Sequence, residues 1–193
     1  MQKDILNIAE LCYSSENLGP GKRFIIWVQG CPFNCANCIA KEFIPFEKAN
    51  VLYVEQLAKI IISQKEINGI TISGGEPMMQ AENLAKLLYI VLSERPKLDV
   101  IVFTGFEMQK INNLRFTKKF IDYIDVLITG LYVDSLNDGK GMKGSINQKT
   151  LFLTDKLIEQ KKYFENYSRN LEMHVREDNY LVIGIPKKDF KKN

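Results

Sequence analysis

Short apolar runs alternate with helical periods along the middle of this chain, and the alternation limits the folds open to it. Apolar residues recur at three- and four-residue spacing over 54–61 and 84–92, as they do along one face of a helix. The runs between and after these helical periods are rich in β-branched and aromatic residues and lie at 24–28, 70–72, 100–103 and 126–128. This alternation predicts right-handed βαβ units around a parallel sheet, with functional loops at the carboxyl ends of the strands.

Length sets how far such a sheet can close. A full eight-fold βα barrel takes roughly 250 residues, whereas this chain has 193 residues, 46% of them hydrophobic. We therefore expect one α/β domain over 1–193, a partial (open) βα barrel with parallel strands whose core occupies about 20–150.

The segment 151–193 predicts a C-terminal helix and a β-hairpin. The helix is expected from about 155 to 167, and the hairpin strands at 171–175 and 180–185 flank a turn at 177–179. Before this segment, a Gly- and Lys-rich stretch at 138–145 indicates a mobile loop. The closing lysines are expected to form a solvated tail; they are Lys187, Lys188, Lys191 and Lys192.

The charge balance and the start of the chain argue against several classes of protein. With 26 Lys and Arg against 23 Asp and Glu, the formal net charge of +3 lacks the strong cationic face of a non-specific nucleic-acid binder. The first residues show no basic region leading into an apolar run, and no window reaches the roughly 18 apolar residues of a membrane span. We expect a cytoplasmic protein with no membrane or nucleic-acid partner.

Three of the four cysteines fall within eight residues, directly after the first predicted strand. Cys31, Cys35 and Cys38 form a C-x3-C-x2-C loop, and three thiolates on one tight loop can ligate three corners of a 4Fe-4S cluster. No fourth ligand stands at short spacing, which favours an iron left open for a substrate or cofactor. The alternative is a zinc-binding interaction module, not an enzyme, that completes its four ligands with Cys12 or His174.

A second motif ends the next predicted strand. Ser73-Gly74-Gly75-Glu76-Pro77 combines paired glycines with a carboxylate and a proline before a predicted helix. The glycines let the backbone approach a ligand closely, and a carboxylate or carbonyl there can accept a hydrogen bond from an ammonium group. Alone the motif is a weak signal, but one βα unit after the cysteine loop it becomes a strong one.

Together the two motifs resemble the signature of the radical S-adenosylmethionine enzymes. The resemblance narrows to the small activating enzymes of glycyl radical enzymes, closest to the anaerobic ribonucleotide reductase activating proteins. It covers roughly residues 17 to 150. Three further stretches carry it: Gly19-Pro20-Gly21-Lys22-Arg23, Phe103-Thr104-Gly105-Phe106 and Gly144-Ser145-Ile146-Asn147-Gln148-Lys149.

The resemblance implies two cofactors and no catalytic side chain. The three loop cysteines would hold a 4Fe-4S cluster that chelates S-adenosylmethionine at its open iron. Gly74, Gly75 and Glu76, with Ser73 beside them, would bind that cofactor and orient its amino group.

Thr104 and Asn37 are further cofactor-binding candidates. Thr104, at a strand end, would meet the ribose, and its alternative role is that of a β-branched strand residue. Asn37 stands where many members of the family carry an aromatic residue that covers the adenine. The adenine contact is then expected from the backbone or from Phe33.

The resemblance also implies the reaction. An external reductant of the flavodoxin or ferredoxin type would deliver one electron, S-adenosylmethionine would be cleaved to a 5'-deoxyadenosyl radical, and the radical would abstract hydrogen from a substrate carbon. An open barrel leaves a lateral mouth for a loop of another protein, and only Cys12 remains for an auxiliary cluster. Both points favour a glycine of a partner glycyl radical enzyme as the substrate. The alternative enzyme is a small radical S-adenosylmethionine enzyme that modifies a peptide or a small molecule.

Four other residues receive a structural interpretation. Trp27 is expected in the core, His174 in the terminal hairpin, and Cys12 as a small buried hydrophobe. Arg23 is expected at a solvated strand end, with a ligand-facing cation as the alternative.

Overall fold

The computed structural model describes residues 4–188, so the predicted tail positions Lys191 and Lys192 lie outside the described residues. The strands are β1 (Ile5–Ser15), β2 (Arg23–Val28), β3 (Asn50–Tyr53), β4 (Gly69–Gly74), β5 (Asp99–Thr104), β6 (Val126–Thr129), β7 (Lys149–Phe152), β8 (Glu172–Val175) and β9 (Tyr180–Ile183). The α-helices are α1 (Val54–Ser63), α2 (Ala81–Glu94), α3 (Met108–Ile111), α4 (Thr117–Ile121) and α5 (Lys161–Asn166). Short 3-10 helices are η1 (Lys41–Phe43), η2 (Pro77–Gln80), η3 (Asp134–Leu136) and η4 (Ile158–Gln160). Within this part of the chain, no helix is long and apolar enough to cross a bilayer.

Seven strands form one mixed sheet in the order β3-β1-β2-β4-β5-β6-β7, with a parallel centre. The parallel strands β2, β4, β5 and β6 are the four predicted strands, which confirms the α/β class. β1, β3 and β7 add antiparallel pairs that the sequence analysis did not predict. In β1 the register against β2 shifts between Ile8 and Glu10 and between Cys12 and Ser15. Such irregularities interrupt the alternation of apolar and polar residues by which a strand is recognised.

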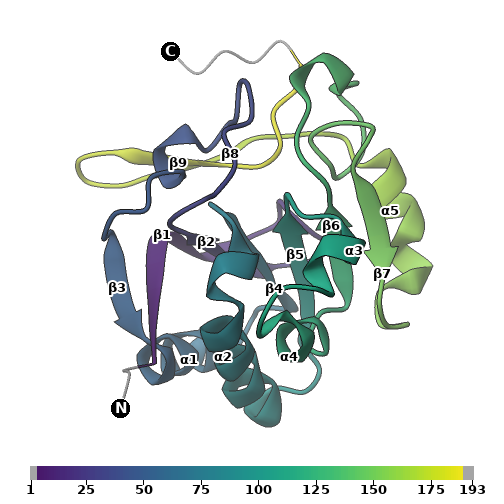
Figure 1. Ribbon diagram of the computed structural model, residues 1–193. Coiled ribbons are helices and arrows are strands. Elements are labelled where there is room, and N and C mark those ends of the chain that lie inside the picture. The colour runs from purple at the N-terminus through teal and green to yellow at the C-terminus, as the bar shows by residue number, and fades with distance from the viewer. Residues whose placement is uncertain (1–3, 189–193) are drawn as a thin grey trace.

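The two faces of the sheet are covered differently. Phe24, Ile26 and Val28 of β2 pack into the main hydrophobic core with α1 and α2, the two predicted amphipathic helices. Ile25 and Trp27 point to the opposite face, where they pack with residues of the β8–β9 hairpin. Figure 1 shows α1, α2 and α4 together at one end of the view and this hairpin at the other. The parallel strands therefore run between a helical layer and the hairpin.

The predicted hairpin is confirmed, but the helix before it is shorter than expected. Only 161–166 is α-helical, because 154–157 forms bends and a turn and η4 follows. The hairpin is fastened to β1: Ser15 Oγ donates to Glu172 Oε2 at 2.6 Å, and the Arg176 guanidinium donates to both Glu10 carboxylate oxygens at 2.9 and 3.1 Å. These contacts hold β8 and β9 against the large sheet.

The Gly- and Lys-rich stretch is packed, which corrects the expectation of a mobile loop. Met142 is fully buried in a core cluster with residues of β6 and α5. Arg169, 2% exposed, donates hydrogen bonds to the backbone carbonyls of Lys140, Gly141 and Lys143. The local composition gives no sign of this partner, because Arg169 lies more than twenty residues further along the chain.

Arg23 is neither solvated nor free to face a ligand, contrary to both interpretations of it. Its side chain is fully buried and donates to Asp99 Oδ1 and Thr71 Oγ1, both at 2.6 Å, and to Ile70 O at 2.9 Å. A buried charge is tolerated when it is paired and its donors are satisfied. Arg23 therefore ties β2 to β4 and β5 inside the sheet.

Candidate functional site

A cavity of about 960 Å³ opens at the carboxyl ends of the parallel strands. The loops that follow β2, β4, β5 and β6 line it, together with the segment after β9. All nine site residues predicted from the sequence lie on this cavity: Cys31, Cys35, Asn37, Cys38, Ser73, Gly74, Gly75, Glu76 and Thr104. Residues far apart in the chain meet here because parallel strands present their carboxyl ends at one edge.

The cysteine loop leaves β2 through a turn that backbone hydrogen bonds hold in place. Gly30 N donates to Phe43 O and Cys31 N donates to Ile44 O, both at 2.9 Å. The φ of Gly30 is +95°, and a Cβ there would lie 2.8 Å from the Phe46 ring. Only glycine adopts this conformation without strain. The turn directs the three cysteine side chains into the cavity.

Burial makes two thiols of the loop less acidic than a free cysteine. Burial raises the pKa of Cys31 to about 11 and also raises the pKa of Cys35, which a backbone hydrogen bond from Tyr132 opposes. Such thiols stay protonated at neutral pH unless a metal cation replaces the proton. The loop therefore fits a metal centre better than a free nucleophile.

The chemistry of the donor set, three thiols from one loop on the cavity, suits an iron–sulfur cluster. Among residues 4–188, no three His, Cys, Asp or Glu side chains converge closely enough to hold one metal ion, so ligation by Cys31, Cys35 and Cys38 stays a prediction. Cys12 and His174, the fourth ligands of the zinc alternative, lie on β1 and β8 with Cys12 Sγ 3.8 Å from His174 Nδ1, and neither lines the cavity.

The Gly-Gly turn packs directly against the cysteine loop. Gly75 N donates to Val28 O at 2.7 Å, and Glu76 N donates to Gly30 O at 2.9 Å. A Cβ on Gly75 would lie 2.4 Å from Gly30 O and 2.8 Å from Phe43 O, both backbone atoms. The contact between the two loops therefore requires a glycine at 75, whether or not a ligand is bound.

Glu76 joins the ends of two strands. The residue is 1% exposed, and its Oε1 accepts from Met78 N at 2.9 Å and from Thr104 Oγ1 at 2.7 Å. Its Oε2 accepts from Gly105 N at 2.8 Å. Burial raises the pKa of Glu76 to about 7, although these three hydrogen bonds act to lower it. The carboxyl group thus ties the end of β4 to the end of β5, and its contact with the cofactor amino group stays a prediction.

Ser73 and Thr104 differ in how free their hydroxyl groups are. The Thr104 hydroxyl donates to Glu76 and accepts from Phe106 N at 3.1 Å, so it already serves the strand ends. Ser73 is half-buried on the cavity, and no partner in residues 4–188 bonds its hydroxyl. Of the two, Ser73 is the one with a polar group available to a ligand, and the ribose contact of Thr104 stays a prediction.

Several polar residues on the cavity were not among the site residues predicted from the sequence: Lys41, Glu42, Tyr132, Asp134, Asn137 and Gln148. Tyr132 Oη donates to Asp134 Oδ1 at 2.6 Å, and Asn37 Nδ2 donates to Asp134 Oδ2 at 2.9 Å. Position was the available signal, because Tyr132 and Asp134 follow the fourth predicted strand at its carboxyl end. The amide of Asn37 thus has a protein partner, and its predicted cofactor contact stays a prediction.

The remaining candidates line the cavity as well. Phe33 packs edge-on against Phe106, with ring centroids 4.7 Å apart, and lines the cavity, while its contact with an adenine stays a prediction. Lys187 and Lys188, expected in a solvated tail, are exposed but belong to the lining of the cavity. The end of the described chain therefore contributes to the site.

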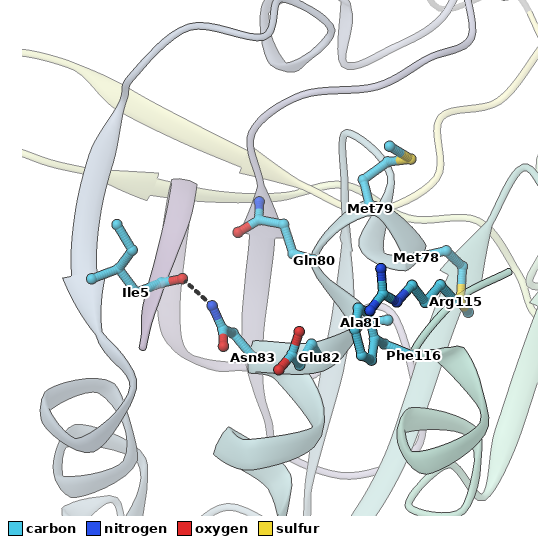
Figure 2. Close-up of a pocket in the computed structure, with 9 residues that line it drawn as sticks. All are labelled: Ile5, Met78, Met79, Gln80, Ala81, Glu82, Asn83, Arg115 and Phe116. Carbon is cyan, nitrogen blue, oxygen red and sulfur yellow. Dashed lines mark hydrogen bonds between the residues drawn. The ribbon is translucent and has the colours of Figure 1, made fainter. Parts of the chain in front are cut away.

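A second, smaller pocket lies beside η2 and the start of α2. Its volume is about 220 Å³, and Figure 2 shows the side chains of Ile5, Met79 and Phe116 around it, with Asn83 Nδ2 bonded to Ile5 O at 2.8 Å. The Arg115 guanidinium lies 4.6 Å from the centroid of the Phe116 ring. None of the predicted site residues lines this pocket, so the chemistry belongs to the larger cavity.

Comparison with known proteins first defines the class. Residues 17–151 match the family described as a 4Fe-4S single cluster domain. This range of the chain contains the cysteine loop, the Gly-Gly turn and all four parallel strands. The match favours an iron–sulfur cluster over the zinc alternative. A solved structure, QueE from Escherichia coli, overlays with a TM-score of 0.44 and 20% identity over 52% of each chain.

The relatives then give the particular family. The anaerobic ribonucleoside-triphosphate reductase-activating protein of Enterobacteria phage T4 is 28% identical over 71% of this chain and 88% of its own length. The proteins of that name from Vibrio cholerae and Escherichia coli K12 are each 30% identical over 67% of this chain, and over 87% and 88% of their own lengths. The chain belongs to this family of activating proteins, which confirms the predicted resemblance and, with it, the cofactor pair of a 4Fe-4S cluster and S-adenosylmethionine.

Proposed function

We propose that this chain activates a glycyl radical enzyme of the anaerobic ribonucleotide reductase type. The observation that carries the proposal is the convergence of the cysteine loop and the 73–76 turn on one cavity, in a chain that spans 87–88% of its reductase-activating relatives. When bound, the cluster and S-adenosylmethionine supply a 5'-deoxyadenosyl radical, which takes a hydrogen atom from a glycine Cα of the partner.

Residues of the chain bind and orient these groups. Cys31, Cys35 and Cys38 hold the cluster by three thiolates, which leaves one iron without a protein ligand. Ser73 offers its free hydroxyl to the polar end of S-adenosylmethionine, and the Cβ-free backbone at Gly74 lets that end come close. With them, Glu76 is expected to act mainly by keeping the ends of β4 and β5 together.

The curvature of the sheet and the electron supply are also part of the proposal. We expect the large sheet to be an open βα barrel, because β3 and β7 end it as unpaired edges among residues 4–188. An open edge admits a protein loop to the cavity. The electron is expected from a carrier of the flavodoxin or ferredoxin type, since the chain has no cysteine set for a second cluster.

The outward face of the hairpin supports a protein partner. Met173, Val175, Tyr180 and Val182 are 62%, 81%, 64% and 36% exposed, and pairing sets Met173 opposite Val182 and Val175 opposite Tyr180. A contiguous apolar patch on a surface is typical of a protein-binding site. β9 leads directly into 184–188, which line the cavity, so a partner docked on the hairpin has a loop within reach of the site.

The test mixes the reconstituted chain with anaerobic ribonucleotide reductase, S-adenosylmethionine and a reductant under anaerobic conditions. Electron paramagnetic resonance should show a glycyl radical doublet on the reductase, and the doublet should vanish when the radical-bearing glycine becomes alanine. Val175→Ser with Tyr180→Ser should lower the radical yield at unchanged cluster content, while Val51→Ser, on the exposed edge strand β3, should not. A new bond in a peptide or small molecule, with no protein radical, would instead identify the other type of radical enzyme.

A further inference from the structure

A side-chain hydrogen bond joins the loop after β6 to the cysteine loop. The side chain of Asp134 accepts from Asn37 Nδ2 at 2.9 Å, one residue before Cys38. This contact falls on the Cys35–Cys38 half of the loop, whereas the backbone of Cys31 donates to Ile44 O, directly after η1.

Asn37 occupies a conformation that needs such support. Its φ is +55°, in the left-handed region, which asparagine adopts more readily than most residues but still less readily than glycine. Cys38 N donates to Cys35 O at 3.2 Å, so Asn37 lies inside the tight turn that separates the two ligands. A hydrogen bond to the Asn37 side chain therefore fixes the spacing of Cys35 and Cys38.

Asp134 is itself anchored from the far side of the cavity. Its Oδ1 accepts from Tyr132 Oη at 2.6 Å, and that hydroxyl accepts from Asn137 Nδ2 at 3.3 Å. Asn137 Oδ1 in turn accepts from Arg169 Nη1 at 2.7 Å. Since Arg169 is buried, the carboxylate of Asp134 is the end of a chain of hydrogen bonds that starts in the protein interior.

We propose that Asp134 is a positioning residue for the cluster loop, which acts by holding Asn37 in its left-handed turn so that Cys35 and Cys38 keep the spacing of two cluster corners. The inference rests on the proposed function only through the presence of the cluster. It assigns to Asp134 no contact with substrate and no part in ligation. Hydrogen-bonded groups around metal ligands orient those ligands and strengthen metal binding.

The test follows iron release from the reconstituted protein to a ferrous chelator, without any partner enzyme. Asp134→Ala and Asn37→Ala should each release iron about tenfold faster, the factor expected for losing one hydrogen bond to a charged group. The double variant should release iron no faster than either single variant, since both remove the same contact. Asp178→Asn, which removes an exposed charge in the hairpin turn with no partner within 4–188, should match the unchanged protein.

Two further measurements separate positioning from general stability. The melting temperature of the iron-free protein should be nearly equal in all these variants, while the spectrum of the reduced cluster should change in Asp134→Ala. Asn37→Gly adopts the left-handed turn without strain, so it should release iron at nearly the rate of the unchanged protein, in contrast to Asn37→Ala, and this pair decides the matter if Asp134→Ala does not fold. Iron release at the unchanged rate in Asn37→Ala and Asp134→Ala, release from Asn37→Gly as fast as from Asn37→Ala, or additive effects in the double variant would overturn the inference. Faster release in a protein whose unchanged form activates no reductase would uphold it and refute the proposed function.

Discussion

Gly75→Ala should loosen the cluster loop itself. The new Cβ would lie 2.4 Å from Gly30 O, below the 3.0 Å that real Cβ contacts respect, and 2.8 Å from Phe43 O. Both are backbone atoms, which cannot rotate away as the end of a flexible side chain would. The turn and the loop must therefore separate by at least about 0.6 Å at the residue that precedes Cys31.

The size of the effect follows from this overlap. Forcing one methyl group into a packed contact costs about 1–3 kcal/mol. For a chain of this length each kcal/mol corresponds to ~2–4 °C in melting temperature, so iron-free Gly75→Ala should melt about 2–12 °C lower. The displacement of the two loops should also reduce the iron bound per chain. Gly30 O accepts the hydrogen bond of Glu76 N, and Gly30 directly precedes Cys31, the first of the three cysteines.

The assay compares melting temperature and iron content after anaerobic reconstitution. Gly139→Asn is the matched control, because nothing lies within 4 Å of a Cβ there and asparagine tolerates the φ of +74°. A Gly75→Ala protein with full iron content and unchanged melting temperature, but weaker S-adenosylmethionine binding, would refute the packing argument. That outcome would return Gly75 to the role expected from the sequence, a place where only the cofactor approaches.

Three further outcomes are expected. Changing any one of Cys31, Cys35 or Cys38 to Ala should abolish the brown colour and the roughly four irons per chain, which iron analysis measures. Cys12→Ala should keep both, because the Cys12 thiol is buried under the hairpin and does not line the cavity. The Glu76 carboxyl, with a pKa of about 7 against an ordinary 4.5, contributes stability that is fully present below pH ~4.5 and lost as pH rises through about 7. Unfolding of the iron-free protein across this window should show a loss on the order of 3 kcal/mol that is absent in Glu76→Gln, and equal pH slopes would contradict it. Arg169→Met should destabilise the protein by about 3 kcal/mol, because it leaves the carbonyls of Lys140, Gly141 and Lys143 without their donor; denaturant unfolding tests this, and a change under 1 kcal/mol would show that water replaces the guanidinium.

The sequence predicted the part of the fold that depends on local periodicity. The four parallel strands, the helices α1 and α2 and the hairpin all carry runs of apolar residues at strand or helix spacing. β1 was missed because its bulges at Ile8–Glu10 and Cys12–Ser15 break that spacing. Arg23 was misjudged because its partner Asp99 lies 76 positions away, and no local pattern reports a buried ion pair between strands.

The same distinction between local patterns and long-range contacts applies to the residues of the site. The meeting of the three cysteines and the Gly-Gly-Glu turn at one cavity was predictable because their residue types and spacing are themselves what cluster chemistry requires. Asp134 was not, because its role depends on reaching Asn37 across the cavity, at a separation of 97 positions. Its place after the fourth predicted strand indicates that Asp134 lies near the cavity, but not that its carboxylate reaches the cysteine loop.

The geometry also explains why glycines and a glutamate belong at this strand end before any cofactor binds. Gly74, with φ of +103°, would place a Cβ 2.4 Å from Val28 N, and Gly75 would place one against Gly30. Glu76 then bonds Thr104 and Gly105 at the end of the neighbouring strand. Three consecutive residues thus join the ends of β2, β4 and β5. The join places Ser73 and the glycine backbone on the cavity that the three thiols line, so that the packing of the strand ends, rather than a flexible loop, sets the distance between the 73–76 turn and the cysteine loop.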